Sequence, residues 1–173
     1  WSVALAADLC VPATFSPAGL SCTPHATLPE AVAAAQSGDV IWVDSVERDE
    51  PVVLADVGQL TIRGLDATAP MQLVGSTGAD GAIRIDGASS VTIEHAVIRG
   101  VGNSRVARVQ DATVVFGGVR LLRDDTTVGN RSAFLILGTA SATFVDCELG
   151  EWETTTHGRH VRAQGSADLV IRN

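Results

Sequence analysis

The 173-residue sequence contains no lysine and no tyrosine, and it has few aromatic residues of any kind. All 12 basic residues are therefore arginines, and 20 acidic residues outnumber them, which gives a formal net charge of −8. Because phosphate contacts need a basic surface, we expect no nucleic-acid partner. The same charge would repel an acidic polysaccharide at long range, and it favours solubility.

Long apolar runs are also missing. No stretch approaches the roughly 20 residues that a membrane helix needs, so we expect no membrane span. With 46% apolar residues the chain is nevertheless too hydrophobic to be disordered, and its length fits one domain. The apolar residues are largely Val, Ile, Leu and Ala in short alternating runs, which is typical of many short strands stacked in layers.

The chain has only three cysteines and no C-x-x-C spacing of the kind that indicates a metal site. A disulfide between Cys10 and Cys22 would close a short loop and stabilise the fold by about 3 kcal/mol. Such bonds form in oxidising compartments, and the sequence begins at Trp1 without an initiator Met or a leader, so we expect a mature protein that is secreted or at the cell surface. Cys147 stands alone in a strand pattern and is predicted to be a small buried residue.

The main feature of the sequence is a pattern that occurs five times between Val52 and Asn173. Two apolar residues spaced by one are followed by a corner of small residues and then by another alternating strand. Offsets of 31, 23, 28 and 27 residues relate the copies, which indicates a solenoid with variable loops. The copies align on Ile62, Ile93, Phe116, Phe144 and Ile171.

Alternation within the copies predicts which side chains point into the solenoid, since successive side chains of a strand face opposite ways. Arg63, Glu94 and Arg172 are predicted to stack in one outward column of charges. The predicted inward positions are Leu60, Ile62 and Leu65, then Val91, Ile93 and Ala96, then Val114, Phe116 and Val119, then Ala142, Phe144 and Cys147, and finally Leu169 and Ile171.

One helix is predicted before the repeats, over residues 27–37. Thr27 and Glu30 have the spacing of a capping box, Pro29 lies in the first turn, and Gly38 follows as the stop. A short amphipathic helix directly before a strand ladder would cap the first coil. We therefore divide the chain into an N-terminal extension with a disulfide, residues 1–26, in which WSVALA would form a strand, and a solenoid with its capping helix, residues 27–173.

The chain resembles the right-handed parallel β-helix family with the pectin-lyase-like fold. The stretch ATLPEAVAAAQSGDVIWV looks like the capping helix and first strand of that family, and SVTIEHAVIRG and SATFVDCELG look like its coils. The resemblance covers about residues 26–173 and implies an all-β, right-handed parallel β-helix with a short N-terminal capping α-helix. Enzymes of the family are mostly polysaccharide lyases, typically with Ca²⁺, or glycoside hydrolases.

Asp124 and Asp125 together with His157-Gly158 are similar to the paired Asp and His-Gly motifs of the hydrolase subset. The other motifs of that subset, Asn-Thr-Asp and Arg-Ile-Lys, do not occur, so RDDTTVGN is better interpreted as a loop and no catalytic residue is assigned. A metal at His157 and His160 would require a helix, which Gly158 disfavours, so we expect neither metal nor cofactor.

Trp152 between Glu151 and Glu153 is a candidate carbohydrate-binding site, since an aromatic ring can stack on a sugar while carboxylates accept hydroxyl protons. The alternative interpretation is a loop of solvated charges around a partly buried ring.

The strand pattern reaches DLVIRN with no cap after it. Either later coils are missing, or the last coil stacks on another molecule. In the second case Trp1, Val3 and Leu5 of a neighbouring copy, or its helix, would cover Leu169 and Ile171. Head-to-tail contacts of this kind build a filament or a ring. The sequence thus favours a non-enzymatic secreted or surface β-helix with a structural, adhesive or fibre-forming role. The alternative is a polysaccharide lyase or glycoside hydrolase of this fold, for which alone Ca²⁺ is expected, or a fragment of one.

Overall fold

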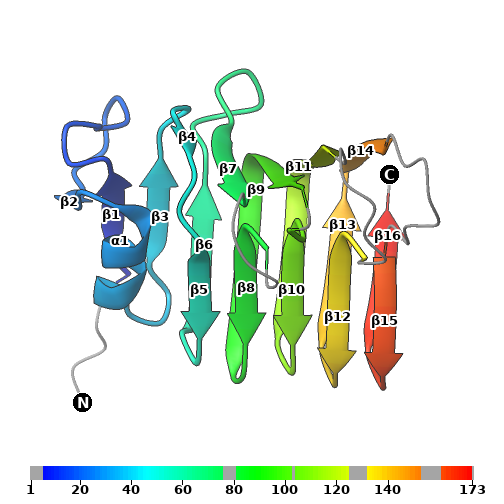
Figure 1. Ribbon diagram of the computed structural model, residues 1–173. Coiled ribbons are helices and arrows are strands. Elements are labelled where there is room, and N and C mark those ends of the chain that lie inside the picture. The colour runs from blue at the N-terminus through cyan, green and yellow to red at the C-terminus, as the bar shows by residue number, and fades with distance from the viewer. Residues whose placement is uncertain (1–5, 76–80, 103, 125–131, 153–160, 173) are drawn as a thin grey trace, which may run out of the picture.

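The computed structural model describes residues 6–75, 81–102, 104–124, 132–152 and 161–172. These residues form a parallel β-helix in which equivalent strands of successive coils lie side by side, with one short helix near the N-terminus (Figure 1). The fold predicted from the repeat is therefore confirmed. The described residues include no helix that is long and apolar enough to cross a bilayer.

Two parallel sheets form the solenoid. Sheet A has eleven described strands, whose main path is β16-β13-β11-β9-β6-β3-β1-β2, while β4 pairs with β7, β7 with β9 and β14 with β11. The strands are β1 (Asp8–Val11), β2 (Thr23–Pro24), β3 (Val40–Val43), β4 (Glu47–Arg48), β6 (Gly58–Arg63), β7 (Met71–Gly75), β9 (Ser89–Val101), β11 (Thr113–Asp124), β13 (Ser141–Val145), β14 (Glu148–Trp152) and β16 (Asp168–Arg172).

Sheet B has five described strands in the order β15-β12-β10-β8-β5. They run opposite to β3, β13 and β16 of sheet A (Figure 1). The chain passes from sheet B into sheet A in each coil. The strands are β5 (Val52–Ala55), β8 (Ile83–Asp86), β10 (Ala107–Gln110), β12 (Phe134–Gly138) and β15 (Val161–Gly165).

The strand register of sheet A confirms the alignment of the repeats. Ile62 pairs with Ile93, Ile93 with Phe116, Phe116 with Phe144, and Phe144 with Ile171. The first four of these side chains are fully buried. A parallel stack places equivalent residues of successive coils in one column, so the sequence alignment corresponds directly to the spatial one.

The prediction for Leu65 was wrong. This side chain is 39% exposed, and the register pairs Ala96 instead with Met71, which is fully buried. Between Leu65 and Met71 the carboxylate of Asp66 accepts a hydrogen bond from the N–H of Thr68 at 2.7 Å, which makes a local turn. The turn lengthens this connection, and the inward position is filled six residues later than the alternation predicts.

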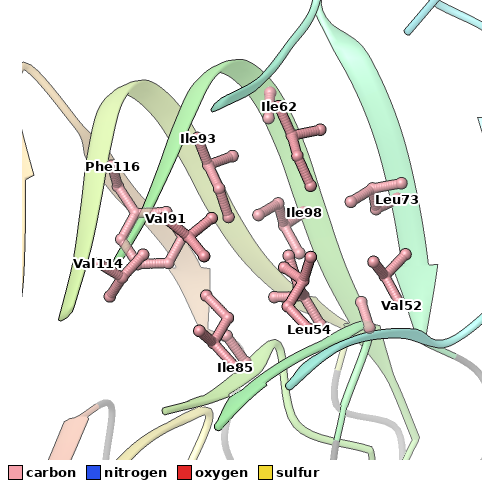
Figure 2. Close-up of a cluster of buried hydrophobic side chains, with 14 of the residues drawn as sticks. Val52, Leu54, Ile62, Leu73, Ile85, Val91, Ile93, Ile98, Val114 and Phe116 are labelled. Atoms are coloured by element: carbon pink, nitrogen blue, oxygen red, sulfur yellow. The ribbon is translucent and has the colours of Figure 1, made fainter. Parts of the chain in front are cut away.

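Side chains from both sheets fill the interior. Figure 2 shows Leu54 of sheet B and Ile62 of sheet A in one cluster of aliphatic residues, and both are fully buried. Further along the solenoid, Phe116 stacks on Phe144 with ring centroids 5.0 Å apart and meets Phe134 edge-on at 5.4 Å. We call Phe116, Phe134 and Phe144 the phenylalanine cluster. Offset-stacked and edge-to-face pairs stabilise a core beyond the area that they bury.

The helix α1 (Leu28–Ala34) begins where the capping box predicts. The hydroxyl of Thr27 accepts a hydrogen bond from the N–H of Glu30 at 3.3 Å, and the carboxylate of Glu30 accepts one from the N–H of Ala26 at 3.1 Å. These bonds satisfy N–H groups that the first turn of a helix leaves without partners. The helix is shorter than the predicted range 27–37.

The N-terminal extension continues the solenoid, because β1 pairs with β3 and β2 pairs with β1. The predicted disulfide between Cys10 and Cys22 is present, with Cα atoms 5.7 Å apart. The buried Leu28 and Ala31 of α1 pack against β1, β3 and β5 and close the interior of the first coil. Most of the predicted WSVALA strand lies outside the described residues, and Ala6 is not in a strand.

The corner from sheet B to sheet A has a left-handed residue in every coil, and Asp alternates with Gly along the first four corners. The Asp111 carboxylate accepts a hydrogen bond from the N–H of Thr139 at 2.9 Å, and a Cβ on Gly138 would collide with that carboxylate. Space therefore requires glycine at Gly138, and its positive φ also favours glycine. The corner residues are Asp56 (φ +54°), Gly87 (+65°), Asp111 (+53°), Gly138 (+68°) and Gly165 (+81°).

We expect Gly138→Ala to lower the free energy of unfolding by about 1–2 kcal/mol from the left-handed backbone alone, and further by displacing Asp111 from Thr139. Combining it with Asp111→Ala should cost less than the sum of the two single changes, because removing the carboxylate makes room for the methyl group. Urea unfolding at pH 7 measures the stability of the four proteins of this cycle.

The hydrogen bond from Thr139 lowers the pKa of Asp111 in the folded protein. The stabilisation by this hydrogen bond is therefore fully present above the ordinary carboxyl pKa, and it is lost as the pH falls through the lowered pKa of Asp111.

Gly102→Ala is the matched control for this cycle. Gly102 has a similar φ of +63°, but a Cβ there would meet nothing within 4 Å. Its substitution should therefore cost only the backbone strain and should be additive with Asp111→Ala. Strict additivity of Gly138→Ala and Asp111→Ala would contradict the coupling of successive corners.

Candidate functional site

Of the residues that the sequence offers for catalysis and sugar binding, the structure describes Asp124, Glu151 and Trp152, which lie at or near the ends of two neighbouring strands. Asp124 ends β11 and Trp152 ends β14, and the register of these strands pairs Arg123 with Trp152. Asp125, Glu153 and His157 lie outside the described residues. The structure therefore brings the ends of the two candidate segments side by side, and a role of Asp124, Glu151 or Trp152 stays a prediction.

The part of the chain that the structure describes contains no group of three or more His, Cys, Asp or Glu side chains placed to hold a metal ion. It does contain a shallow, open pocket of about 220 Å³ on the outer face of sheet A. The Asp39 carboxylate at this pocket already accepts hydrogen bonds from the N–H groups of Ala7 and Gln36, both at 2.7 Å. This acid supports the backbone of the first coil. The pocket lining is Gly38, Asp39, Gln59, Leu60, Thr61, Ser90 and Thr92.

The predicted outward column of charges is present in part. Arg63 and Glu94 are paired across adjacent strands and form an ion pair, and the Arg63 guanidinium lies 5.1 Å from the ring centroid of Trp42. Arg172 lies in the same column but two coils separate it from the Glu94 strand. Pairs of this kind contribute about 0.2–1 kcal/mol each, so the column stabilises the stacking of coils.

Cys147 is half-buried and packs against the core. Its Sγ lies 3.3 Å from the carbonyl oxygen of Phe116, to which the thiol can donate. Burial raises the pKa of the Cys147 thiol above its ordinary value. Because the thiolate is the reactive form, this environment fits the structural role predicted for Cys147.

The largest departure from a closed core lies in the last described coil. We define the open end as β15 and β16, which are the edge strands of sheets B and A. Leu169 and Ile171 are 39% and 53% exposed, whereas Ala142 and Phe144, their partners one coil earlier, are fully buried. The two residues point inward by register but have no described coil above them. Among the described residues no strand pairs with the outer edge of β15 or β16, so these two strands end the described part of the solenoid.

The opposite end of the solenoid is protected, and we define the closed end as β1, β2 and α1. The last strand of sheet A there is β2, which has two residues, one of them Pro24. Proline lacks an N–H and cannot donate to a further strand, and a very short edge strand is a poor template. The disulfide between Cys10 and Cys22 ties this strand segment to β1, and α1 lies beside β5 of sheet B.

Sequence reasoning placed Leu169 and Ile171 in the inward column and Arg172 in the outward column of charges, but it did not single out Asp168, which shares a strand with Arg172. Asp168 and Arg172 begin and end β16 and lie on its outward side, in the columns of Ser141 and Val145. The predicted partners Trp1, Val3 and Leu5 lie outside the described residues.

Comparison of the chain with protein-family models, with curated proteins and with solved structures found no match.

Proposed function

We propose that this protein is a non-enzymatic, secreted or cell-surface β-solenoid with a structural, adhesive or fibre-forming role, and that it self-associates through its open end. The observation that carries the proposal is the 53% exposure of Ile171 directly above the fully buried Phe144. Removing apolar surface from water is favourable by about 25 cal/mol per Å². A β-strand laid on the open end covers this surface and also pairs the free N–H and C=O groups of the edge strands.

The disulfide between Cys10 and Cys22 supports the extracellular location, because such bonds persist mainly in oxidising environments. Membership of the pectin-lyase-like family is likewise a proposal. It is supported by the order of elements, in which a capped helix is followed directly by a strand and then by repeating coils. A fold of this kind does not itself imply catalysis.

The test is a measurement of mass against concentration. Light scattering behind size-exclusion chromatography should show a mass that rises above that of the 17.9 kDa chain as concentration increases. Ile171→Glu should abolish the rise, because a carboxylate would then have to be buried without a partner.

Val53→Glu is the matched control for this test. Val53 is 51% exposed on the outer side of β5, and its substitution should leave the association unchanged. A strict monomer at every concentration, or an equal loss of association in both variants, would refute the proposal.

A further inference from the structure

We propose that the pocket on the outer face of sheet A binds a neutral pyranose sugar through side-chain hydroxyl and amide groups of β6 and β9. The pocket lies within the described sheet, where β3, β6 and β9 lie side by side (Figure 1). Both β6 and β9 have paired strands on either side. The inference goes beyond the self-association proposed above and does not depend on it.

The hollow lies where the first coil has no side chain. The N–H of Gly38 donates to the carbonyl of Gln59 at 2.7 Å, so Gly38 lies directly beside Gln59 of the next coil. Its φ of +101° is one that side chains rarely adopt, so the backbone itself favours glycine there. The pocket volume of about 220 Å³ is several times the share of a single water molecule.

Four polar side chains in two rows line this pocket. Gln59 pairs with Ser90 in the register of β6 and β9, and Thr61 pairs with Thr92 two positions further along. Neighbouring strands lie about 4.8 Å apart, and alternate residues of a strand lie about 6.6 Å apart, so the four groups form a compact rectangle. Within the described part of the chain, none of the four side chains makes an intramolecular hydrogen bond.

The chemistry of these groups matches that of a sugar. A hydroxyl and a primary amide each donate and accept hydrogen bonds, and so does each ring hydroxyl of a pyranose. Two hydroxyls on adjacent ring carbons can therefore bond to two neighbouring side chains of the pocket. An ammonium ligand only donates and a carboxylate ligand only accepts, so either would leave part of this capacity unused.

The charges around the pocket disfavour an anionic ligand. The Asp39 carboxylate lies at the pocket and accepts hydrogen bonds with both oxygens, as an ionised carboxylate does. Arg63 follows Thr61 on the outward side of β6, but it forms an ion pair with Glu94 and lies over the Trp42 ring. With a net charge of −8 on the chain, a hexose should bind better than the uronic acid derived from it.

The test is a titration of the isotope-labelled 173-residue chain, followed by amide chemical shifts. D-galactose, D-glucose and D-mannose are the probes, since they present the common arrangements of ring hydroxyls. At least one of them should shift the amides of Gln59, Thr61, Ser90 and Thr92. The dissociation constant should lie roughly in the millimolar range, as expected for a ligand of about twelve non-hydrogen atoms in a shallow site. If none of the three sugars shifts these amides, the proposal is overturned.

D-galacturonate tests the charge preference. It differs from D-galactose by a carboxylate in place of a hydroxymethyl group, so it should bind about threefold or more weakly than D-galactose. Tighter binding of the uronate than of the hexose would overturn the assignment of a neutral ligand.

Thr92→Val keeps the shape of the side chain and removes its hydroxyl, so the dissociation constant should rise about threefold to tenfold. Thr143→Val is the matched control. Thr143 lies in the same outward column two coils further along, outside the pocket, and Val115 between them shows that valine fits this column. Circular dichroism checks that both variants remain folded. Equal weakening by Thr92→Val and Thr143→Val would place the binding elsewhere and overturn the proposal.

A second pair of variants tests the other row of the pocket. Ser90→Ala should weaken binding by a similar factor, whereas Ser141→Ala should leave it unchanged. Ser141 lies in the column of Ser90 two coils further along and does not line the pocket. Sugar binding that is insensitive to both Ser90→Ala and Thr92→Val would contradict the assigned groups.

A linear hexamer of the bound hexose identifies the source of the sugar. If the hexamer shifts the same amides, the pocket accepts a unit of a polysaccharide, and if only the free hexose does so, it accepts a free sugar. Both results keep the pocket as a neutral-sugar site. A chain that stays monomeric yet binds the sugar would refute the self-association and leave this inference standing.

Discussion

Replacing Phe116 with alanine is expected to lower the free energy of unfolding by about 3–5 kcal/mol, which is the usual cost of truncating a buried phenylalanine. Phe116 is fully buried and contacts the rings of both Phe134 and Phe144. The truncation therefore removes one transfer contribution and two ring contacts, and it leaves a cavity between the two sheets. Single domains are typically stable by about 5–15 kcal/mol, so the loss is a large share of the total.

Chemical denaturation followed by circular dichroism measures this loss, and Val115→Ala is the control. Val115 is the neighbour of Phe116 in β11, but it points outward and is only half-buried, so its truncation should cost less than about 1.5 kcal/mol. Each coil of a solenoid contacts mainly its neighbours. Hydrogen exchange should therefore accelerate more in β11, β12 and β13 than in β1 and β3. A loss below about 1 kcal/mol for Phe116→Ala would be incompatible with the packing of the phenylalanine cluster.

Breaking the disulfide with Cys22→Ser is expected to destabilise the protein by about 3 kcal/mol, the loop-closure value for a short loop. The separation between Cys10 and Cys22 is 12 residues. Without the bond, β2 is held to β1 by two register pairs and by the hydrogen bond from the N–H of His25 to the carbonyl of Cys10. The closed end should consequently become the least protected part of sheet A in hydrogen exchange.

Thermal unfolding with and without a reductant measures this effect. Reduction should lower the melting temperature of the wild type to that of Cys22→Ser and should leave the variant unchanged. Cys147→Ala is the matched control, since it removes a free thiol and should retain the response to reductant. If reduction frees Cys10 and Cys22 without lowering the melting temperature, the disulfide is not what secures the closed end.

The sequence predicted the stacking of coils well because two periodicities coincide in it. Alternation determines which side chains of a strand point inward, and the parallel repeat determines which residues share a column. The column from Ile62 to Ile171 could therefore be predicted from the sequence alone. Leu65 was placed wrongly because a local turn at Asp66 interrupts the period, and a side-chain hydrogen bond of that kind leaves no trace in the apolar pattern.

The corners and the open end were predictable only in part. The small residues at Gly87 and Gly138 indicated bends. Asp56 and Asp111 occupy equivalent left-handed positions, which Asp adopts more readily than most residues but which an Asp in the sequence does not by itself indicate. The direction of the backbone groups along β16 could not be predicted. That direction depends on the hydrogen bonds to β13 and is visible only in the assembled sheet.

The left-handed corners also bear on how such a chain tolerates change in length. The segments Gly87–His95 and Gly138–Asp146 each join two left-handed residues over the same number of positions, while the offsets between successive copies range from 23 to 31 residues. Variation in coil length is therefore concentrated in the connections that return the chain to sheet B. Insertions there would leave every column in register, so these connections are the places where new sequence can be added without redesigning the scaffold.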